Sequence, residues 1–207
     1  MTNPAVRFET TPNPQTLRFT ADEVLATLSG KSFTERPVEF KNATEAQFSP
    51  LAKKLFGFPW AAGVYIGRDF ITVTKQDWVD WDIIAEPLAG LIEEHLESGA
   101  PIVNAAKAVD TSGAMTSGVV DASDKSLAQA GDSVAIIEIK RVLNEEIRPM
   151  VAQDGGDVEF AKYEDGVVYL HMRGSCAGCP SSTMTLKMGI ETRLQEAVPE
   201  IREVVSI

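Results

Sequence analysis

The chain has 207 residues, 44% of them hydrophobic, and a formal net charge of −11 at pH 7. This length allows one large or two small domains with a buried core. The acidic balance excludes a broad nucleic-acid-binding surface, because such surfaces neutralise phosphates with Lys and Arg. Apolar runs of about 18 residues are missing, and the N-terminus lacks the pattern of a signal or transit peptide. We expect a soluble protein without membrane partners, in the bacterial cytoplasm or, as a processed form, in the mitochondrial matrix.

The first part of the chain, residues 1–103, predicts a small α+β domain. Short strand-like runs carry the apolar residues Phe8, Leu17, Phe19, Val38 and Phe40. Residues 49–56 predict a short capped helix, and residues 64–66 and 70–73 predict strands joined by a turn. A helix over about 81–97, with apolar residues at helical spacing, completes a sandwich of helices on a sheet.

Aromatic and histidine side chains of this first domain have a structural interpretation. We expect the three tryptophans, Trp60, Trp78 and Trp81, to be buried or half-buried, as core aromatic residues commonly are. The alternative is that they form a partner-binding surface. His95 follows Leu91 by one helical turn and is expected to be packed or capping. The domain has neither a Gly-rich phosphate loop nor a set of catalytic residues, so we expect no enzyme activity.

Residues 104–132 are small and polar, with no aromatic residue and no sustained periodicity. Such a composition buries too little apolar surface to fold alone and predicts a flexible linker. The alternative is an ordered arm that lies on one domain.

The C-terminal part, residues 133–207, predicts the order α-β-β-α-β. Asp132 or Ser133 caps a helix whose core stripe is Ile136, Ile139, Leu143, Ile147 and Met150. Asp154 and Asp157 bracket two glycines that end this helix, and we interpret both carboxylates as structural. A hairpin follows, with a turn at 164–166 and alternating apolar residues at Val158, Phe160, Val168, Leu170 and Met172. A second helix after Pro180 carries Leu186, Ile190, Leu194 and Val198, and a short strand lies around Val204 and Val205.

The two cysteines of the chain, Cys176 and Cys179, form a single Cys-x-x-Cys pair between the hairpin and the second helix. Such a pair is a redox disulfide, half of a zinc site, or half of the four-thiolate set of an iron–sulfur cluster. The N–H groups and dipole at the start of the helix lower thiol pKa values, so we expect both sulfurs to be thiolate-like. One chain supplies only two ligands, whereas two chains supply four. His171 lies on the opposite face of its strand from Leu170 and Met172 and is not expected to ligate.

These motifs resemble the NifU/Nfu family of iron–sulfur cluster scaffold proteins. The resemblance is carried in the C-terminal domain by residues 147–149, 154–160 and 174–187, and in the N-terminal domain by residues 11–19, 49–52 and 69–75. It covers both domains and omits only the linker. The resemblance implies that Cys176 and Cys179 bind a cluster between two subunits. It favours [4Fe–4S] and leaves [2Fe–2S] open as the alternative.

The function implied is a non-enzymatic carrier, which receives a cluster from upstream assembly proteins and passes it to apo iron–sulfur proteins from a cluster-bridged homodimer. Two alternatives use the same sulfur atoms. A thioredoxin-like thiol oxidoreductase is disfavoured because we expect the motif to lack the parallel β-α-β setting of redox Cys-x-x-Cys pairs, since a hairpin, and not a crossover helix, precedes it. A zinc-bridged structural dimer stays open because Zn²⁺ accepts four cysteine ligands.

Overall fold

A computed structural model of the chain describes residues 6–21, 37–104, 128–129, 131–177 and 180–207. The chain divides into two compact units, Met1–Val120 and Asp121–Ile207. Each unit combines a sheet with helices, which confirms the predicted α+β class. The predicted bounds of the two domains stay predictions, and most of the predicted linker lies outside the described residues.

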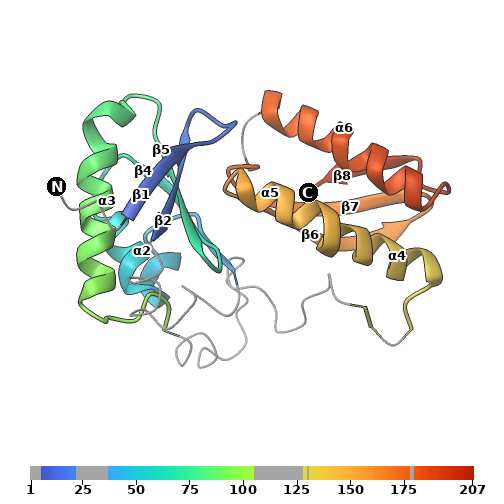
Figure 1. The fold of residues 1–207 in the computed structure, drawn as a ribbon, viewed down its shortest axis with the longest axis horizontal. Helices are drawn as coiled ribbons and strands as arrows, with labels where there is room; N and C mark the ends of the chain where they lie inside the picture. The colour runs from blue at the N-terminus through green and yellow to red at the C-terminus, as the bar shows by residue number, and fades with distance from the viewer. Residues whose placement is uncertain (1–5, 22–36, 105–127, 130, 178–179) are drawn as a thin grey trace. The chain divides into compact units, whose positions relative to one another are not determined.

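The N-terminal unit is built on an antiparallel sheet of five strands (Figure 1). Its strands are β1 (Val6–Thr10), β2 (Thr16–Ala21), β3 (Val38–Phe40), β4 (Ala61–Ile66) and β5 (Phe70–Lys75). The spatial order is β1-β2-β5-β4-β3. The predicted strands at 64–66 and 70–73 are therefore confirmed as adjacent members of this sheet.

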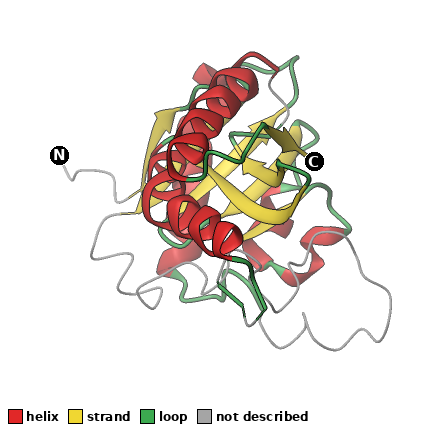
Figure 2. Ribbon diagram, turned by 90° about the vertical axis from the view of Figure 1, so that its right-hand side faces the viewer, coloured by secondary structure: helices red, strands yellow, loops and turns green. Residues whose placement is uncertain are grey.

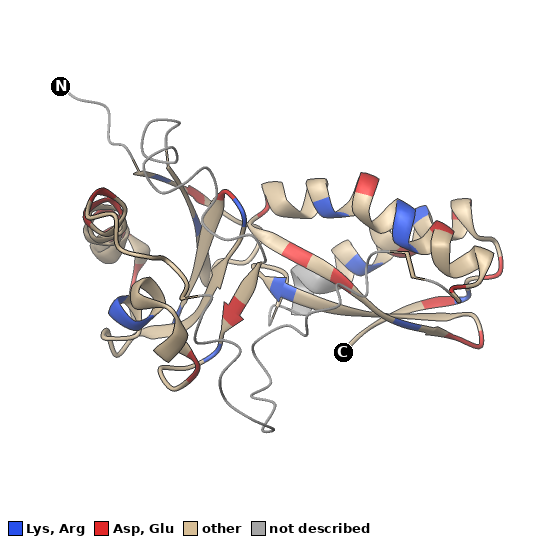
Figure 3. Cartoon of the chain, turned by 90° about the horizontal axis from the view of Figure 1, so that it is seen from below, with Lys and Arg blue, Asp and Glu red and all other residues tan. Residues whose placement is uncertain are grey.

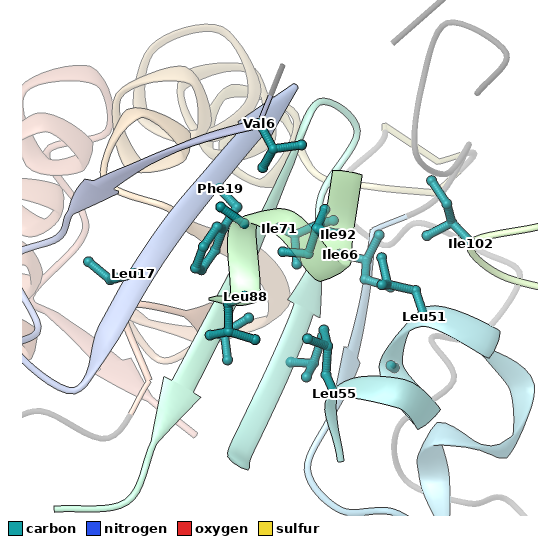
Figure 4. Close-up of a cluster of buried hydrophobic side chains, with 14 of the residues drawn as sticks. Val6, Leu17, Phe19, Leu51, Leu55, Ile66, Ile71, Leu88, Ile92 and Ile102 are labelled. Atoms are coloured by element: carbon teal, nitrogen blue, oxygen red, sulfur yellow. The ribbon is translucent and has the colours of Figure 1, made fainter. Parts of the chain in front are cut away.

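Two helices cover the apolar face of this sheet. The short helix α2 (Pro50–Leu55) begins after Ser49, whose hydroxyl accepts a hydrogen bond from the N–H of Ala52 at 3.0 Å, as predicted for a capped helix. The long helix α3 (Trp81–Glu97) has the predicted bounds. Figure 4 shows Leu88 and Ile92 of α3 among the buried side chains of the sheet. This burial at helical spacing holds α3 on the unit.

The three tryptophans do not share one environment. Trp60 is buried and stacks on Phe58, and Trp81 is half-buried, with its Nε1 donating to the carbonyl of Pro14 at 3.0 Å. Trp78, by contrast, is 67% exposed, so the expectation of burial is wrong for this residue. It lies in the turn that joins β5 to α3, where helical or strand periodicity makes no statement about burial.

His95 is fully buried in α3, which confirms its packing role. Burial lowers the pKa of its imidazole, and the nearby charge of Lys54 acts in the same direction. His95 is therefore a neutral core residue at neutral pH.

The C-terminal unit has the predicted order of elements. Its helices are α4 (Val134–Val142), α5 (Arg148–Gln153) and α6 (Pro180–Ala197), and its strands are β6 (Gly156–Glu164), β7 (Val167–Gly174) and β8 (Glu203–Ser206). The helices lie over one face of a sheet with the order β6-β7-β8 (Figures 1 and 2). The hairpin turns at Asp165 and Gly166, both with positive φ, as a two-residue turn requires.

The first helix of this unit contains a π-helical turn, Leu143–Ile147, which the sequence did not predict. Pro149 lies just after it and has no N–H for the i−4 carbonyl, so the widened turn accommodates a residue that the interior of a regular α-helix disfavours. One residue is gained in the turn, and the core stripe moves from the predicted Met150, which is 47% exposed, to Val151, which is fully buried. The assignment of Met150 to the core is therefore wrong.

The strands β7 and β8 are parallel neighbours, with α6 as the crossover between them. The cysteine pair thus lies in the strand-to-helix connection of a parallel β-α-β unit. The expectation that a parallel β-α-β setting is missing is therefore wrong. The short run at Val204 and Val205 gives no indication of its partner strand or direction. The preceding hairpin, β6 with β7, is also present.

Acidic residues dominate parts of the surface, as the net charge requires. Helix α3 carries Asp and Glu residues but neither Lys nor Arg (Figure 3). Among the described helices, none has the length and apolar character needed to cross a membrane.

Candidate functional site at the cysteine loop

The cysteine pair lies on the loop from the end of β7 at Gly174 to the start of α6 at Pro180. Gly174 has a φ of 62°, a left-handed conformation that favours glycine, and the N–H of Ala177 donates to its carbonyl at 3.1 Å. The chain therefore turns sharply immediately before Cys176. Gly178 and Cys179 lie outside the described residues, so Cys176 is the one sequence-predicted ligand whose position is known.

Cys176 is 6% exposed and belongs to the buried apolar cluster of the C-terminal unit. Its Sγ lies against the backbone of Gly156, the first residue of β6. A Cβ atom added to Gly156 would overlap this sulfur and would come within 3.1 Å of the Arg173 carbonyl and the Ser175 hydroxyl. The sulfur therefore occupies space that any other residue at 156 would fill.

Hydrogen bonds tie the cysteine loop to the turn between α5 and β6. The Ser175 hydroxyl donates to the carbonyl of Asp154 at 2.6 Å, and the Ser175 N–H donates to the carbonyl of Gly155 at 3.1 Å. Gly155 has a φ of 77°, the left-handed conformation predicted for the end of the helix. In the hairpin, Gly156 is paired with Gly174. Besides ending the helix, the glycines of this turn therefore place the turn next to the cysteine loop.

An ion pair also restrains this turn, at the residue that follows Gly156. Arg148 donates to Asp157 through Nε and Nη2, each at 2.9 Å from a carboxylate oxygen, and through Nη1 to the Asn144 side chain at 3.1 Å. Such a bidentate pair restrains both position and orientation. The structural interpretation of Asp157 agrees with this contact. Sequence reasoning assigned no role to Arg148, although the residue lies within the run 147–149 that carries the family resemblance.

The electrostatic environment of Cys176 differs from the sequence prediction. Burial raises the pKa of the Cys176 thiol to about 11, and the carboxylates of Asp154 and Asp157 add to the rise, while the Ser175 hydroxyl, 3.9 Å from the sulfur, opposes it. The expected thiolate character is therefore wrong for Cys176. Its side chain is directed into the core, where desolvation outweighs the favourable field of the helix start.

His171, the histidine of the same unit, has the predicted exposed position. Its Nδ1 lies 3.3 Å from the carbonyl of Ile207. Within the described part of the chain, His, Cys, Asp and Glu side chains do not gather in any group of three or more that could hold a metal ion.

Comparison with known protein families assigns both units. Residues 139–205 match the NifU-like domain, and residues 6–99 match the N-terminal domain of the scaffold protein Nfu/NifU. The chain belongs to the Nfu/NifU family. The family resemblance of the sequence motifs is thereby confirmed, in the N-terminal as well as the C-terminal half.

Curated relatives match nearly the whole chain. The mitochondrial NFU1 iron-sulfur cluster scaffold homologs of Drosophila sechellia and Drosophila persimilis are each 38% identical over 96% of the chain. The chain spans 63% and 64% of the length of these relatives. Among solved structures, a NifU-like protein from Saccharomyces cerevisiae is 24% identical, with a TM-score of 0.40 over 48% of this chain and 84% of that one.

Proposed function

We propose that this chain is an iron–sulfur cluster scaffold that holds a cluster between two copies of itself and passes it to apo-proteins. The observation that carries the proposal is the Cys176 and Cys179 pair, which contains all the cysteines of the chain, in the strand-to-helix loop of a NifU-like domain. The relatives named as iron-sulfur cluster scaffold homologs support the same assignment.

The ligand count requires a second chain. An iron–sulfur cluster is commonly held by four thiolates, and one chain supplies two. Two copies related by a two-fold axis bring the same loop together twice and complete the set. We propose [4Fe–4S] as the cargo, following the family resemblance, with [2Fe–2S] as the second form that this ligand set accommodates.

Delivery needs no catalytic group on this chain. Cysteine thiols of an apo-protein replace Cys176 and Cys179 on iron one at a time. Each incoming thiol loses a proton as it binds, and each released thiolate takes one up. No electron is transferred, so the oxidation state of the cluster does not change. The cluster is therefore cargo, and we propose that the chain is a carrier and not an enzyme. Its partners are upstream cluster-assembly proteins and recipient apo iron–sulfur proteins. The mitochondrial relatives favour the mitochondrial matrix over the bacterial cytoplasm.

Two other uses of the cysteine pair make different predictions. A thiol oxidoreductase would find a suitable strand-to-helix setting here, but the burial of Cys176 and its raised pKa oppose a role as attacking thiolate. A zinc-bridged dimer would use the same four sulfurs. Anaerobic purification followed by a visible absorption spectrum and iron, sulfide and zinc analysis separates the three. Broad visible absorption with iron and sulfide supports the scaffold, whereas stoichiometric zinc without colour, or no metal, contradicts it.

Single substitution of either cysteine tests the ligand assignment. In Cys176→Ser or Cys179→Ser, each dimer loses half of its thiolate ligands, so we expect stable cluster binding to be lost. The fold should be kept, with a lower stability in Cys176→Ser because a hydroxyl replaces a buried sulfur. Iron and sulfide content after anaerobic reconstitution measures the effect. His171→Ala, an exposed change on the strand that leads to the loop, is the control and is expected to retain the cluster. Full iron and sulfide retention in either serine variant would refute the assignment.

A further inference from the structure

The sulfur of Cys176 lies in a small pocket beside β6, and this pocket exists only because residue 156 has no side chain. The pocket is bounded by the backbone of Gly156 on one side and by the apolar cluster of the C-terminal unit on the other. With 6% of the residue exposed, protein atoms occupy most of the space around the sulfur. A thiolate that binds a metal ion has it at about 2.3 Å from the sulfur. The described position of Cys176 therefore leaves little room for a metal ion at its sulfur.

We infer that in the cluster-free protein the Cys176 sulfur is stored against Gly156, that Gly156 is the residue that positions it there, and that the sulfur turns out of this pocket when it takes iron. The last part rests on the proposed function, because it needs Cys176 to be a cluster ligand. The first two parts concern the cluster-free protein alone.

Three features of the surroundings support a built pocket. Gly156 is paired with Gly174 in the hairpin, so the backbone of β6 runs beside the start of the cysteine loop. The Ser175 hydroxyl holds the carbonyl of Asp154 at 2.6 Å, which keeps the loop on the turn before Gly156. Arg148 fixes Asp157, the residue after Gly156, through two hydrogen bonds of 2.9 Å. The position of Gly156 under the sulfur is thus restrained on both sides.

A double-mutant cycle in the full-length, reduced, cluster-free chain tests the pocket. A methyl group at 156 and the sulfur at 176 cannot occupy the same space, so we expect Gly156→Ala to lower the Tm of the C-terminal unit by about 5 °C or more. In the Cys176→Ala background the same change should lower Tm by less than half as much, because the overlap with the sulfur is gone and only the two contacts of 3.1 Å, to the Arg173 carbonyl and the Ser175 hydroxyl, remain. Equal shifts in the two backgrounds would overturn the role of Gly156.

Gly189 supplies the matched control. It lies in α6 of the same unit, and a Cβ atom added there meets no atom within 4 Å. Gly189→Ala should therefore shift Tm equally with and without Cys176. All three tryptophans lie in the N-terminal unit, so their fluorescence follows that unit separately while far-ultraviolet circular dichroism follows the whole chain. A shift in the tryptophan transition would show that the effect is not local, and would count against the inference.

The outward turn is tested by repeating the Tm comparison on protein loaded with cluster. If the sulfur has left the pocket, the penalty of Gly156→Ala is smaller in the loaded dimer than in the cluster-free chain. An unchanged penalty overturns this part. If the wild-type chain takes up no cluster at all, the proposed function fails while the result of the cluster-free cycle still stands.

A measurement without any substitution covers the case in which Gly156→Ala does not fold. In nuclear magnetic resonance spectra of the reduced, cluster-free wild type, the β-protons of Cys176 should show nuclear Overhauser effects to the α-protons of Gly156. Their presence supports the storage pocket. Their absence in a folded protein with both residues assigned would refute it.

Discussion

At the scale of single residues, the protonation of Cys176 sets what the cluster-free protein can do. The raised pKa of about 11 means that the thiol keeps its proton at neutral pH. Binding to iron requires the thiolate, so uptake of a cluster at this position releases a proton. In its proposed role as a ligand, Cys176 therefore gives up a buried contact as well as a proton when it binds iron.

The pH dependence of thiol alkylation in Cys179→Ser, where Cys176 alone remains, tests this environment. The alkylation rate follows the thiolate fraction, so we expect it to keep rising between about pH 7 and pH 10, without the plateau that an ordinary cysteine with a pKa near 8.5 would give. The same chain in denaturant is the control and should reach its plateau near pH 9 to 10. A native plateau at the same pH as in denaturant would show that Cys176 is not buried as described.

The sign of the accompanying stability change follows from the direction of the shift. The folded pKa of Cys176 lies above the unfolded value, so the neutral buried thiol stabilises the fold fully below about pH 8.5. This contribution is lost as pH rises toward the folded pKa of about 11. Alkaline conditions should therefore weaken the C-terminal unit in the wild type more than in Cys176→Ala.

At the scale of secondary structure, the π-helical turn decides which side of the first helix of the C-terminal unit faces the core. Val151 is fully buried and Met150 is 47% exposed, whereas the sequence pattern predicts Met150 in the core stripe. We expect Val151→Ala to cost about 2 kcal/mol of unfolding free energy, from lost burial and a residual cavity. Met150→Ala is the control and should change it by less than about 0.5 kcal/mol. Urea unfolding followed by circular dichroism measures both, and equal costs would contradict the shifted stripe.

The elements themselves could be predicted because they depend on local periodicity. The alternation of Val168, Leu170 and Met172 and the helical spacing of Ile190 and Leu194 both report a buried face, and all five residues are buried. A local sequence pattern does not predict which strands pair when they lie far apart in the chain. The parallel direction of β8 depends on a crossover by α6, and its two valines would fit either direction.

The chemistry of the candidate site was predictable in part, for the same reason. The spacing of Cys176 and Cys179 predicts a metal or redox pair, which stays a prediction, and the two glycines predict the turn that the structure has at Gly155. The burial of Cys176 depends on Gly156, which lies twenty residues earlier in the chain and reaches the sulfur only through the hairpin pairing with Gly174. The nearby helix start predicts a lowered pKa for the Cys176 thiol. The pKa is raised instead, because the side chain points into the apolar cluster.

At the scale of the whole molecule, the supply of two thiolates per chain links cluster binding to association. We expect the cluster-free chain to be largely monomeric and the loaded form to be a dimer with one cluster, because the second pair of ligands comes from the second copy. Native mass spectrometry gives both masses and the iron content. Removal of iron with a chelator should return the monomer. A monomer that carries a complete cluster would contradict the shared site.

The division into two units predicts that ligation belongs to the C-terminal one. A chain of residues 133–207 contains both cysteines and encloses its own apolar cluster, from Ile139 on α4 to Val204 on β8. We expect it to fold alone, as circular dichroism would show, and to bind the same amount of iron per chain as the full protein. The N-terminal unit has its own core and is expected to act on delivery by raising the local concentration of a recipient near the cluster.

Transfer of cluster to an apo acceptor separates these two roles. The full chain and residues 133–207, loaded to the same iron content, should differ in transfer rate at low acceptor concentration and converge as the acceptor becomes abundant, because a tether contributes effective concentration and no chemistry. A rate difference that persists at high acceptor concentration would place the N-terminal unit in the exchange step itself. An isolated C-terminal piece that is unfolded, or cannot be loaded under conditions that load the full chain, would show that the cluster-binding unit extends beyond these residues.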